Sequence, residues 1–156
     1  MGAHDSALIG EDPKGIPNNL MPILNKVASA ERPYLEIFGD DYPTKDGTAE
    51  RDYIHVMDLV EGHLAALYYL KDHSGLDFFN LGTGHAISVL DLAKQFEVAI
   101  TKKINKNFSS RRVGDLPVYY ANINKSAILL NWSVKRSVKE ICVSSWLWYR
   151  SRGVKI

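Results

Sequence analysis

Short segments with strand-like patterns alternate along this chain with longer segments that have helical spacing. Residues 34–38 alternate apolar and polar side chains, residues 53–56 form a second short extended segment, and residues 77–81 are apolar through their middle. This alternation indicates the α/β class, with a further possible strand near residues 104–108. Because a typical sheet has about five or six strands, the few short strands predict part of a larger α/β protein.

Five segments have apolar residues at helical spacing, and each follows a residue type that favours a helix start. Ser88 with Asp91, and Ser137 with Glu140, have the spacing of a capping box. Asp58 is expected to cap the helix that contains Leu59 and Leu67. The helix starts are therefore expected at or just after Asn19, Asp58, Ser88, Asn124 and Ser137.

Charge and cysteine content exclude several kinds of protein. The net charge of the 156 residues is +1, so no broad basic surface for nucleic acid is expected. Cys142 is the single cysteine, which excludes an intramolecular disulfide and a cysteine-rich zinc site. No apolar run approaches the ~20 residues of a membrane span, and the first residues do not begin a signal peptide. We expect a reduced, cytoplasmic setting without membrane contact.

Two loops carry arginines in positions that suit an anionic ligand. Arg51 follows a glycine-containing turn and enters an extended segment, and Arg112 precedes Gly114 and Asp115 in a later loop. A guanidinium matches phosphate oxygens with a planar fork of donors, and the helix start after Asn19 offers free N–H groups. From spacing alone, ordinary surface ion pairs are the favoured explanation of these arginines.

Other patterns that could carry chemistry are incomplete. Residues 82–84 read Gly-Thr-Gly between a predicted strand and a helix, but Ile87 replaces the third glycine of a dinucleotide fingerprint. A tight turn is the favoured interpretation. The five histidines have no metal-ligand spacing, and the chain has no convincing Ser/His/Asp arrangement. We predict no metal site and no catalytic residue from these patterns.

Several ordered motifs together resemble one enzyme family. They are Gly10-Glu11-Asp12-Pro13, Gly15-Ile16-Pro17-Asn18-Asn19-Leu20-Met21-Pro22, Phe38-Gly39-Asp40-Asp41-Tyr42-Pro43-Thr44, Arg51-Asp52-Tyr53-Ile54-His55-Val56-Met57-Asp58-Leu59, Asn80-Leu81-Gly82-Thr83-Gly84 and Arg111-Arg112-Val113-Gly114-Asp115. In order and spacing they resemble the C-terminal half of the UDP-glucose 4-epimerase family, within the extended Rossmann-type short-chain dehydrogenases/reductases. The resemblance reaches to about Tyr149.

The resemblance implies a UDP-glucose or UDP-galactose ligand. Arg51 and Arg112 would clamp its pyrophosphate, and Asp115 would bind the ribose hydroxyls. The implied substrate-binding residues are Asn19, Leu20, Glu36, Ile37, Phe38, Arg51, Tyr53, Arg112, Asp115 and Tyr119. Of these, residues 19 and 20 would contact phosphate or sugar, residues 36–38 would line the uridine, and the two tyrosines would complete the pocket wall.

The family's reaction is reversible C4 epimerisation, an isomerase reaction of galactose metabolism that uses NAD-mediated hydride transfer and a 4-keto intermediate. By the resemblance, the catalytic Tyr-x-x-x-Lys pair and the NAD-binding fingerprint belong to an N-terminal half absent here. NAD would then be bound mainly by that half, and the isolated chain would be inactive. No tyrosine of this chain has a lysine four residues later.

Residues 1–156 are therefore expected to form a C-terminal UDP-sugar-binding region. Elements within about residues 51–99 would pack on the missing Rossmann sheet, and the full-length protein would be a homodimer. A non-catalytic sugar-nucleotide-binding fragment or a truncated gene product is the alternative function.

Overall fold

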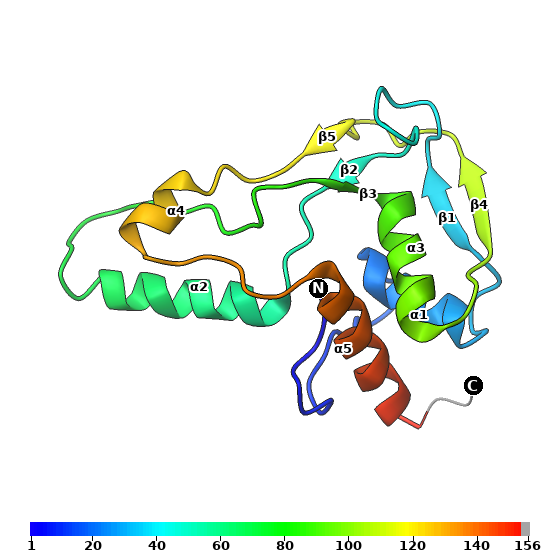
Figure 1. Ribbon diagram of the computed structural model, residues 1–156, viewed down its shortest axis with the longest axis horizontal. Helices are drawn as coiled ribbons and strands as arrows, with labels where there is room; N and C mark the ends of the chain where they lie inside the picture. Colours follow the sequence, from blue (N-terminus) through cyan, green and yellow to red (C-terminus); the bar gives the residue numbers. More distant parts are fainter. Residues whose placement is uncertain (154–156) are drawn as a thin grey trace.

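A computed structural model describes residues 1–153 as an α/β arrangement with short strands (Figure 1). In chain order the elements are α1 (Leu20–Ala28), β1 (Leu35–Phe38), β2 (Glu50–Arg51), α2 (Val56–Tyr69), β3 (Ile87–Ser88), α3 (Val89–Ile100), β4 (Lys106–Ser109), β5 (Val118–Tyr119), α4 (Asn124–Leu129) and α5 (Val138–Ser151). The predicted α/β class with few strands is confirmed.

The strands form two small sheets. β1 pairs in parallel with β4, and β2 lies between β3, to which it is antiparallel, and β5, to which it is parallel. In the second sheet Arg51 is opposite Tyr119. Each parallel pair joins segments far apart in the sequence, so both sheets are tertiary contacts rather than local hairpins.

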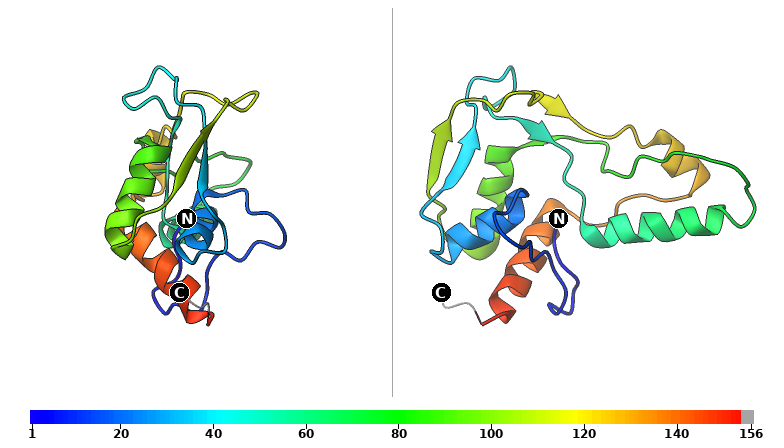
Figure 2. Two further views of the ribbon diagram at one scale, coloured as in Figure 1. Left: turned by 90° about the vertical axis from the view of Figure 1, so that its right-hand side faces the viewer. Right: turned by 180° about the vertical axis from the view of Figure 1, so that it is seen from behind.

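The hydrophobic core lies between α1, α3, α5 and one face of β1 (Figures 1 and 2). Phe96 of α3 is fully buried and meets Trp146 of α5 edge to face, with ring centroids 6.2 Å apart. Leu24 of α1 and Ile37 of β1 are also buried in this cluster. Burial of these side chains positions α1 and β1, two of the elements that line the pocket described below.

The helix predictions are largely confirmed. The Ser88 hydroxyl accepts from the Asp91 N–H at 2.9 Å, and Ser137 and Glu140 form a complete capping box at the start of α5. No helix in residues 1–153 is both long enough and apolar enough to cross a membrane.

The start of α2 differs from the prediction. The expected strand at residues 53–56 is replaced by the shorter β2, and α2 begins before Asp58. His55 is the N-cap, because its Nδ1 accepts the Met57 N–H at 3.1 Å. Asp58 lies in the first turn, where it is buried and bonded to Arg136 at 2.6 Å. Asp58 is thus an ion-pair partner rather than a cap.

The predicted strand at residues 77–81 is wrong for this chain. These residues are irregular, and the Phe78 side chain is 75% exposed. A strand requires backbone hydrogen bonds to a neighbouring strand, and within residues 1–153 this segment pairs with none. It extends beside α2 and α4, away from the core (Figure 1).

Truncating the core ring that joins α3 to α5 tests this packing. We expect Phe96→Ala to lower the free energy of unfolding by about 3–5 kcal/mol, from lost burial and the cavity left behind. Val98→Ala, on the exposed side of α3, should change it by less than about 0.5 kcal/mol. Urea denaturation of both variants measures the difference, and equal effects would contradict the assigned core.

Candidate functional site: a pocket between helix α1 and two arginine loops

A pocket of about 290 Å³ opens where the N-terminus of α1, the C-terminal ends of β1 and β2, and the loop around residues 111–115 meet. Parallel pairing brings the two distant arginine-bearing segments to the same side of the core. We call this pocket the α1 pocket. It is lined by Met1, Asn18, Asn19, Leu20, Ile23, Leu35, Glu36, Phe38, Ala49, Arg51, Tyr53, Val89, Arg112 and Asp115.

The structure brings together every predicted site residue except Ile37 and Tyr119. Ile37 is 1% exposed because strand alternation turns it into the core, between Glu36 and Phe38, which face the pocket. Tyr119 is 65% exposed and lines a neighbouring pocket that shares Arg51. The prediction that Ile37 and Tyr119 line this pocket is therefore wrong.

Sequence reasoning missed the apolar lining of the pocket. Ile23, Leu35, Ala49 and Val89 all contribute to its walls. Their apolar patterning gave a signal for burial, but a residue that covers a pocket has the same pattern as one that fills a core.

The N-terminus of α1 is open toward the pocket. Asn19 is the N-cap in an extended conformation, but its side chain makes no capping bond. Its Nδ2 instead donates to Glu11 Oε1 at 2.6 Å, and no acidic residue occupies the first turn. Free N–H groups and the helix dipole make this end of α1 favourable for an anion.

Arg51 is held at the pocket by three contacts. Its Nη1 donates to the carbonyls of Glu50 and Leu116, both at 2.8 Å, and its Nη2 lies 3.3 Å from Asp115 Oδ1. Both Arg51 and Asp115 are partly buried. The guanidinium therefore has a fixed orientation before any ligand arrives.

Arg112 and Arg111 are neighbours in sequence with different surroundings. The Arg112 guanidinium lies over the Phe38 ring, 3.9 Å from its centroid, and within residues 1–153 Arg112 forms no ion pair. Arg111 donates from Nε to Asp41 at 2.6 Å and stacks on Tyr42. Its hydrogen bond lowers the pKa of Asp41. Of the two, only Arg112 lines the pocket with an uncompensated charge.

Tyr53 forms part of the pocket floor. It is 8% exposed, and burial raises its pKa well above the usual range, although the charge of Arg51 opposes the shift. A neutral phenol can donate a hydrogen bond but cannot act as a base near pH 7. Tyr53 therefore suits ligand contact rather than proton abstraction.

The Gly82-Thr83-Gly84 turn has its backbone donors occupied by a side chain. The N–H groups of Thr83 and Gly84 donate to Asp52 at 2.9 and 3.2 Å, and the Thr83 hydroxyl donates at 2.7 Å. A Cβ at position 82 would lie 2.4 Å from Asp52 Oδ2, which explains the glycine. Because a carboxylate fills the turn, the turn does not fit a dinucleotide pyrophosphate.

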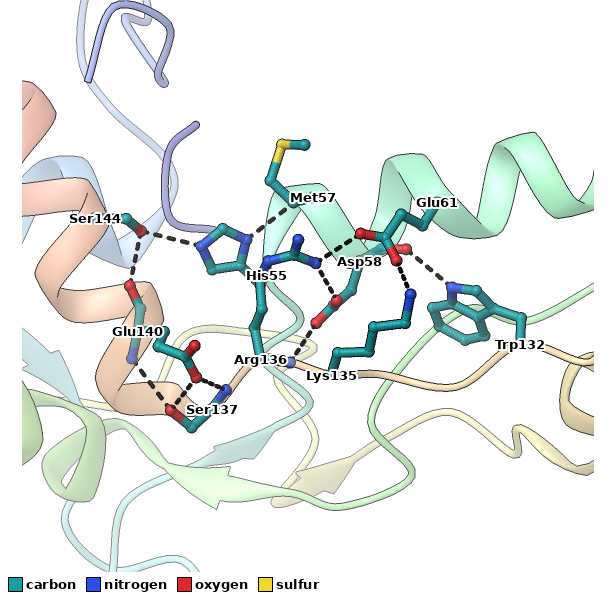
Figure 3. A network of polar contacts seen from close by, with 10 residues as sticks. All are labelled: His55, Met57, Asp58, Glu61, Trp132, Lys135, Arg136, Ser137, Glu140 and Ser144. Carbon is teal, nitrogen blue, oxygen red and sulfur yellow. Dashed lines mark hydrogen bonds and ion pairs between the residues drawn. The ribbon is translucent and has the colours of Figure 1, made fainter. Parts of the chain in front are cut away.

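A serine–histidine contact emerges that sequence reasoning did not find (Figure 3). His55 Nε2 lies 3.0 Å from Ser144 Oγ, beside a cavity of about 540 Å³. Since His55 Nδ1 accepts the Met57 N–H, the ring proton sits on Nε2 and is donated to Ser144. Ser144 in turn donates to the Glu140 carbonyl at 2.7 Å. His55 cannot take the serine proton in this arrangement, so the pair is structural.

The same network fixes α2 to the chain segment before α5 (Figure 3). Arg136 Nη1 donates to Asp58 at 2.6 Å and to Glu61 at 3.0 Å, and Lys135 pairs with Glu61 at 2.7 Å. Trp132 Nε1 donates to the Asp58 carbonyl at 3.1 Å. These charges are paired among themselves, which leaves the α1 pocket as the better candidate for an anionic ligand. In the part of the chain that the structure describes, no group of three or more possible metal ligands occurs.

Comparisons with known proteins agree with this description of the fold. The model of the "NAD dependent epimerase/dehydratase family" matches residues 6–82. A UDP-glucose 4-epimerase of Cyamopsis tetragonoloba is 52% identical over 149 residues, which are 95% of this chain and 43% of that protein. The chain thus spans less than half the length of the curated relatives it matches.

Two solved structures of UDP-glucose 4-epimerases are also similar. That from Stenotrophomonas maltophila, with bound NAD and formylated UDP-arabinopyranose, has 42% identity and a TM-score of 0.94, covering 97% of this chain and 45% of that one. That from Bifidobacterium longum, in complex with NAD+ and UDP, has 42% identity and a TM-score of 0.93, covering 99% and 46%.

These matches show what the chain is similar to, which is first a class of proteins, the NAD-dependent epimerases and dehydratases. Within that class, the chain resembles part of the UDP-glucose 4-epimerases.

One expectation requires correction. The sequence was interpreted as lacking NAD binding, with the cofactor assigned to a half of the protein outside this chain. That assignment is wrong, because the model of an NAD-dependent family matches residues 6–82 of this chain, and NAD-bound structures align with nearly all of it.

The buried histidine gives the protein a pH-dependent stability. Burial, followed by the charge of Arg136, lowers the pKa of His55, while Asp58 opposes the shift and the N-terminal amine and Asp5 contribute smaller effects. The unfolded chain then binds more protons near pH 6, so this contribution to stability is present above the unfolded pKa of about 6.5 and is lost as pH falls.

We expect the free energy of unfolding to be larger at pH 7.5 than at pH 5.5, and His55→Asn to flatten this dependence. Asparagine can still cap α2 but does not titrate. Urea denaturation at both pH values measures the effect, and an unchanged slope in the variant would exclude His55 as its source.

Proposed function

We propose that the α1 pocket binds a UDP-sugar through its diphosphate. The observation that carries this proposal is the convergence of Arg51, Arg112 and the uncapped N-terminus of α1 on one pocket. A diphosphate carries two or more negative charges, and each of these three groups offers donors directed at an anion. Glu36 and Asp115 also line the pocket, so the site offers guanidinium and N–H donors to an anion rather than a net positive charge.

The remaining lining residues suit the other parts of such a ligand. Glu36 is held by the Ser109 hydroxyl at 2.6 Å and lies beside Phe38 at the end of β1, where a uridine would pack. Asp115, positioned by Arg51, can accept hydrogen bonds from ribose hydroxyls. Tyr53 and Asn19 offer donors toward the phosphate and sugar.

We also propose that the longer protein is a UDP-glucose 4-epimerase, which interconverts UDP-glucose and UDP-galactose in galactose metabolism. The similar enzymes support this proposal, and two of their structures hold a UDP compound by name. NAD would supply hydride transfer at the sugar C4. A cytoplasmic homodimer is part of the same proposal.

Residues 1–156 are proposed as the UDP-sugar-binding region of that enzyme, and their placement in its C-terminal half stays a prediction. Residues within about 51–99 would pack against further sheet structure. The exposed apolar side chains Val60, Leu64 and Leu67 of α2, together with Phe78, support such packing. The alternative, a non-catalytic binding fragment, shares the same pocket.

Removing either pocket arginine should weaken UDP-glucose binding. We expect Arg51→Ala and Arg112→Ala each to raise the Kd about 10- to 100-fold, because a hydrogen bond to a charged group contributes about 1.5–3 kcal/mol. Isothermal titration calorimetry of residues 1–156 measures both values.

Arg111→Ala is the matched control, since Arg111 is adjacent in sequence but contacts Asp41 and Tyr42. Its Kd should stay within about twofold of the parent value. The absence of saturable binding by the unmodified chain would reject the proposed function.

We predict that residues 1–156 alone do not interconvert UDP-galactose and UDP-glucose, even with added NAD. The chain contains no tyrosine four residues before a lysine, and the buried Tyr53 is unsuited to act as a base. A coupled assay of the purified chain tests this. NAD-dependent product formation would contradict it and would favour a catalytic group within these residues.

A further inference from the structure

Asp52 links three separate segments of the chain beside the pocket. Its carboxylate accepts hydrogen bonds from the N–H and hydroxyl of Thr83, from the Gly84 N–H and, at 3.2 Å, from the Ala121 N–H. Thr83 and Gly84 precede β3, and Ala121 follows β5, so one side chain joins both outer strands of the sheet to the middle strand.

The strands joined in this way are very short. Across β2 and β5, the Glu50 N–H donates to Pro117 O at 2.8 Å and the Asp52 N–H donates to Tyr119 O at 3.2 Å. Pairing over two residues is marginal without support from neighbouring contacts. The bond from Ala121 to the Asp52 carboxylate continues this pairing beyond the last backbone bond and opposes slippage between the strands.

The register of β2 against β5 determines where Arg51 sits. Arg51 is opposite Tyr119, and its guanidinium reaches Asp115 and the Leu116 carbonyl in the segment that enters β5. A shift of that segment would move both partners away from the guanidinium.

We propose, on the basis of the proposed function, that Asp52 is the positioning residue for the diphosphate-binding arginine. It does not line the α1 pocket and acts only through Arg51. Its role is to hold β3, β2 and β5 in the register that presents Arg51 to a ligand.

Two acceptor oxygens at position 52, and not only a side chain of this size, are required. Both carboxylate oxygens accept from N–H groups, and Oδ2 faces the Gly84 and Ala121 donors. In Asp52→Asn one oxygen becomes an NH₂ group, which is a donor. This NH₂ group faces either the N–H donors of Gly84 and Ala121 or, if the amide is flipped, the donors of Thr83, so hydrogen bonds are lost in both orientations. The variant keeps the shape of the side chain while breaking one side of the link.

The test compares the affinities of UDP and uridine for residues 1–156, measured by calorimetry. Uridine lacks the diphosphate and would contact the β1 side of the pocket. Asp52→Asn should weaken UDP binding by about tenfold, the loss of roughly one charge-assisted contact. Uridine, which keeps the ribose contact to Asp115 but lacks the diphosphate, should be weakened by less than about threefold. Asp72→Asn, an exposed site with the same charge change, is the control and should leave both affinities unchanged.

Equal weakening of UDP and uridine would overturn the positioning role, because general loosening of the fold affects both ligands. Unchanged UDP affinity in Asp52→Asn would overturn it too. If that variant cannot be purified folded, Thr83→Val, which removes one donor to Asp52, is measured against the same criterion. Failure of the unmodified chain to bind UDP would instead reject the proposed function.

Discussion

The two parallel strand pairings, β1 with β4 and β2 with β5, are the contacts on which the pocket depends. The first brings Phe38 to the segment that leads to Arg112, and the second brings Arg51 to Asp115 and Leu116. Neither pair of segments is close in sequence. The core of α1, α3 and α5 supports β1 and aims the N-terminus of α1 at the same place. The site is therefore a product of tertiary packing.

The guanidinium groups of the pocket are fixed in place before a ligand binds, and Glu36 and Asp115 balance their formal charge. Arg51 is fixed by two carbonyls and by Asp115, whereas Arg112 rests on an aromatic ring without a carboxylate partner in residues 1–153. Fixing a guanidinium in the free protein removes part of the entropic cost of binding. This arrangement brings two guanidinium groups to the place where α1 also offers free N–H groups.

Local signals in the sequence predicted most helices and two of their caps, because capping depends on residues three or four apart. Ser88 and Ser137 cap as their spacing indicated. Strands were harder, since residues 77–81 have the composition of a strand but pair with no other strand in the described chain. His55 as the cap of α2 was missed although its bond from the Met57 N–H is local, because Asp58 is the commoner type of cap residue. Only its contact with Ser144, 89 positions away, depends on the tertiary fold.

Most pocket residues were predicted through the resemblance of the motifs to a known family. Spacing alone indicated only Arg51, Arg112 and the helix start after Asn19. Ile37 shows the limit of that approach, because strand alternation turns it into the core between two pocket residues. Tyr119 shows another limit, since it is paired with Arg51 but faces the adjacent pocket. The role of Asp52 has no local signal in the sequence, because its partners are backbone groups of distant turns.

An NMR titration of ¹⁵N-labelled residues 1–156 with UDP tests directly whether the α1 pocket is the UDP site. Saturable amide shifts are expected at Leu20, Phe38, Arg51 and Arg112, around that pocket. Thr83 and Gly84, whose N–H groups are already bound by Asp52, should shift little. Shifts concentrated at residues 82–84, or around His55 and Ser144, would contradict the assignment of the α1 pocket as the UDP site.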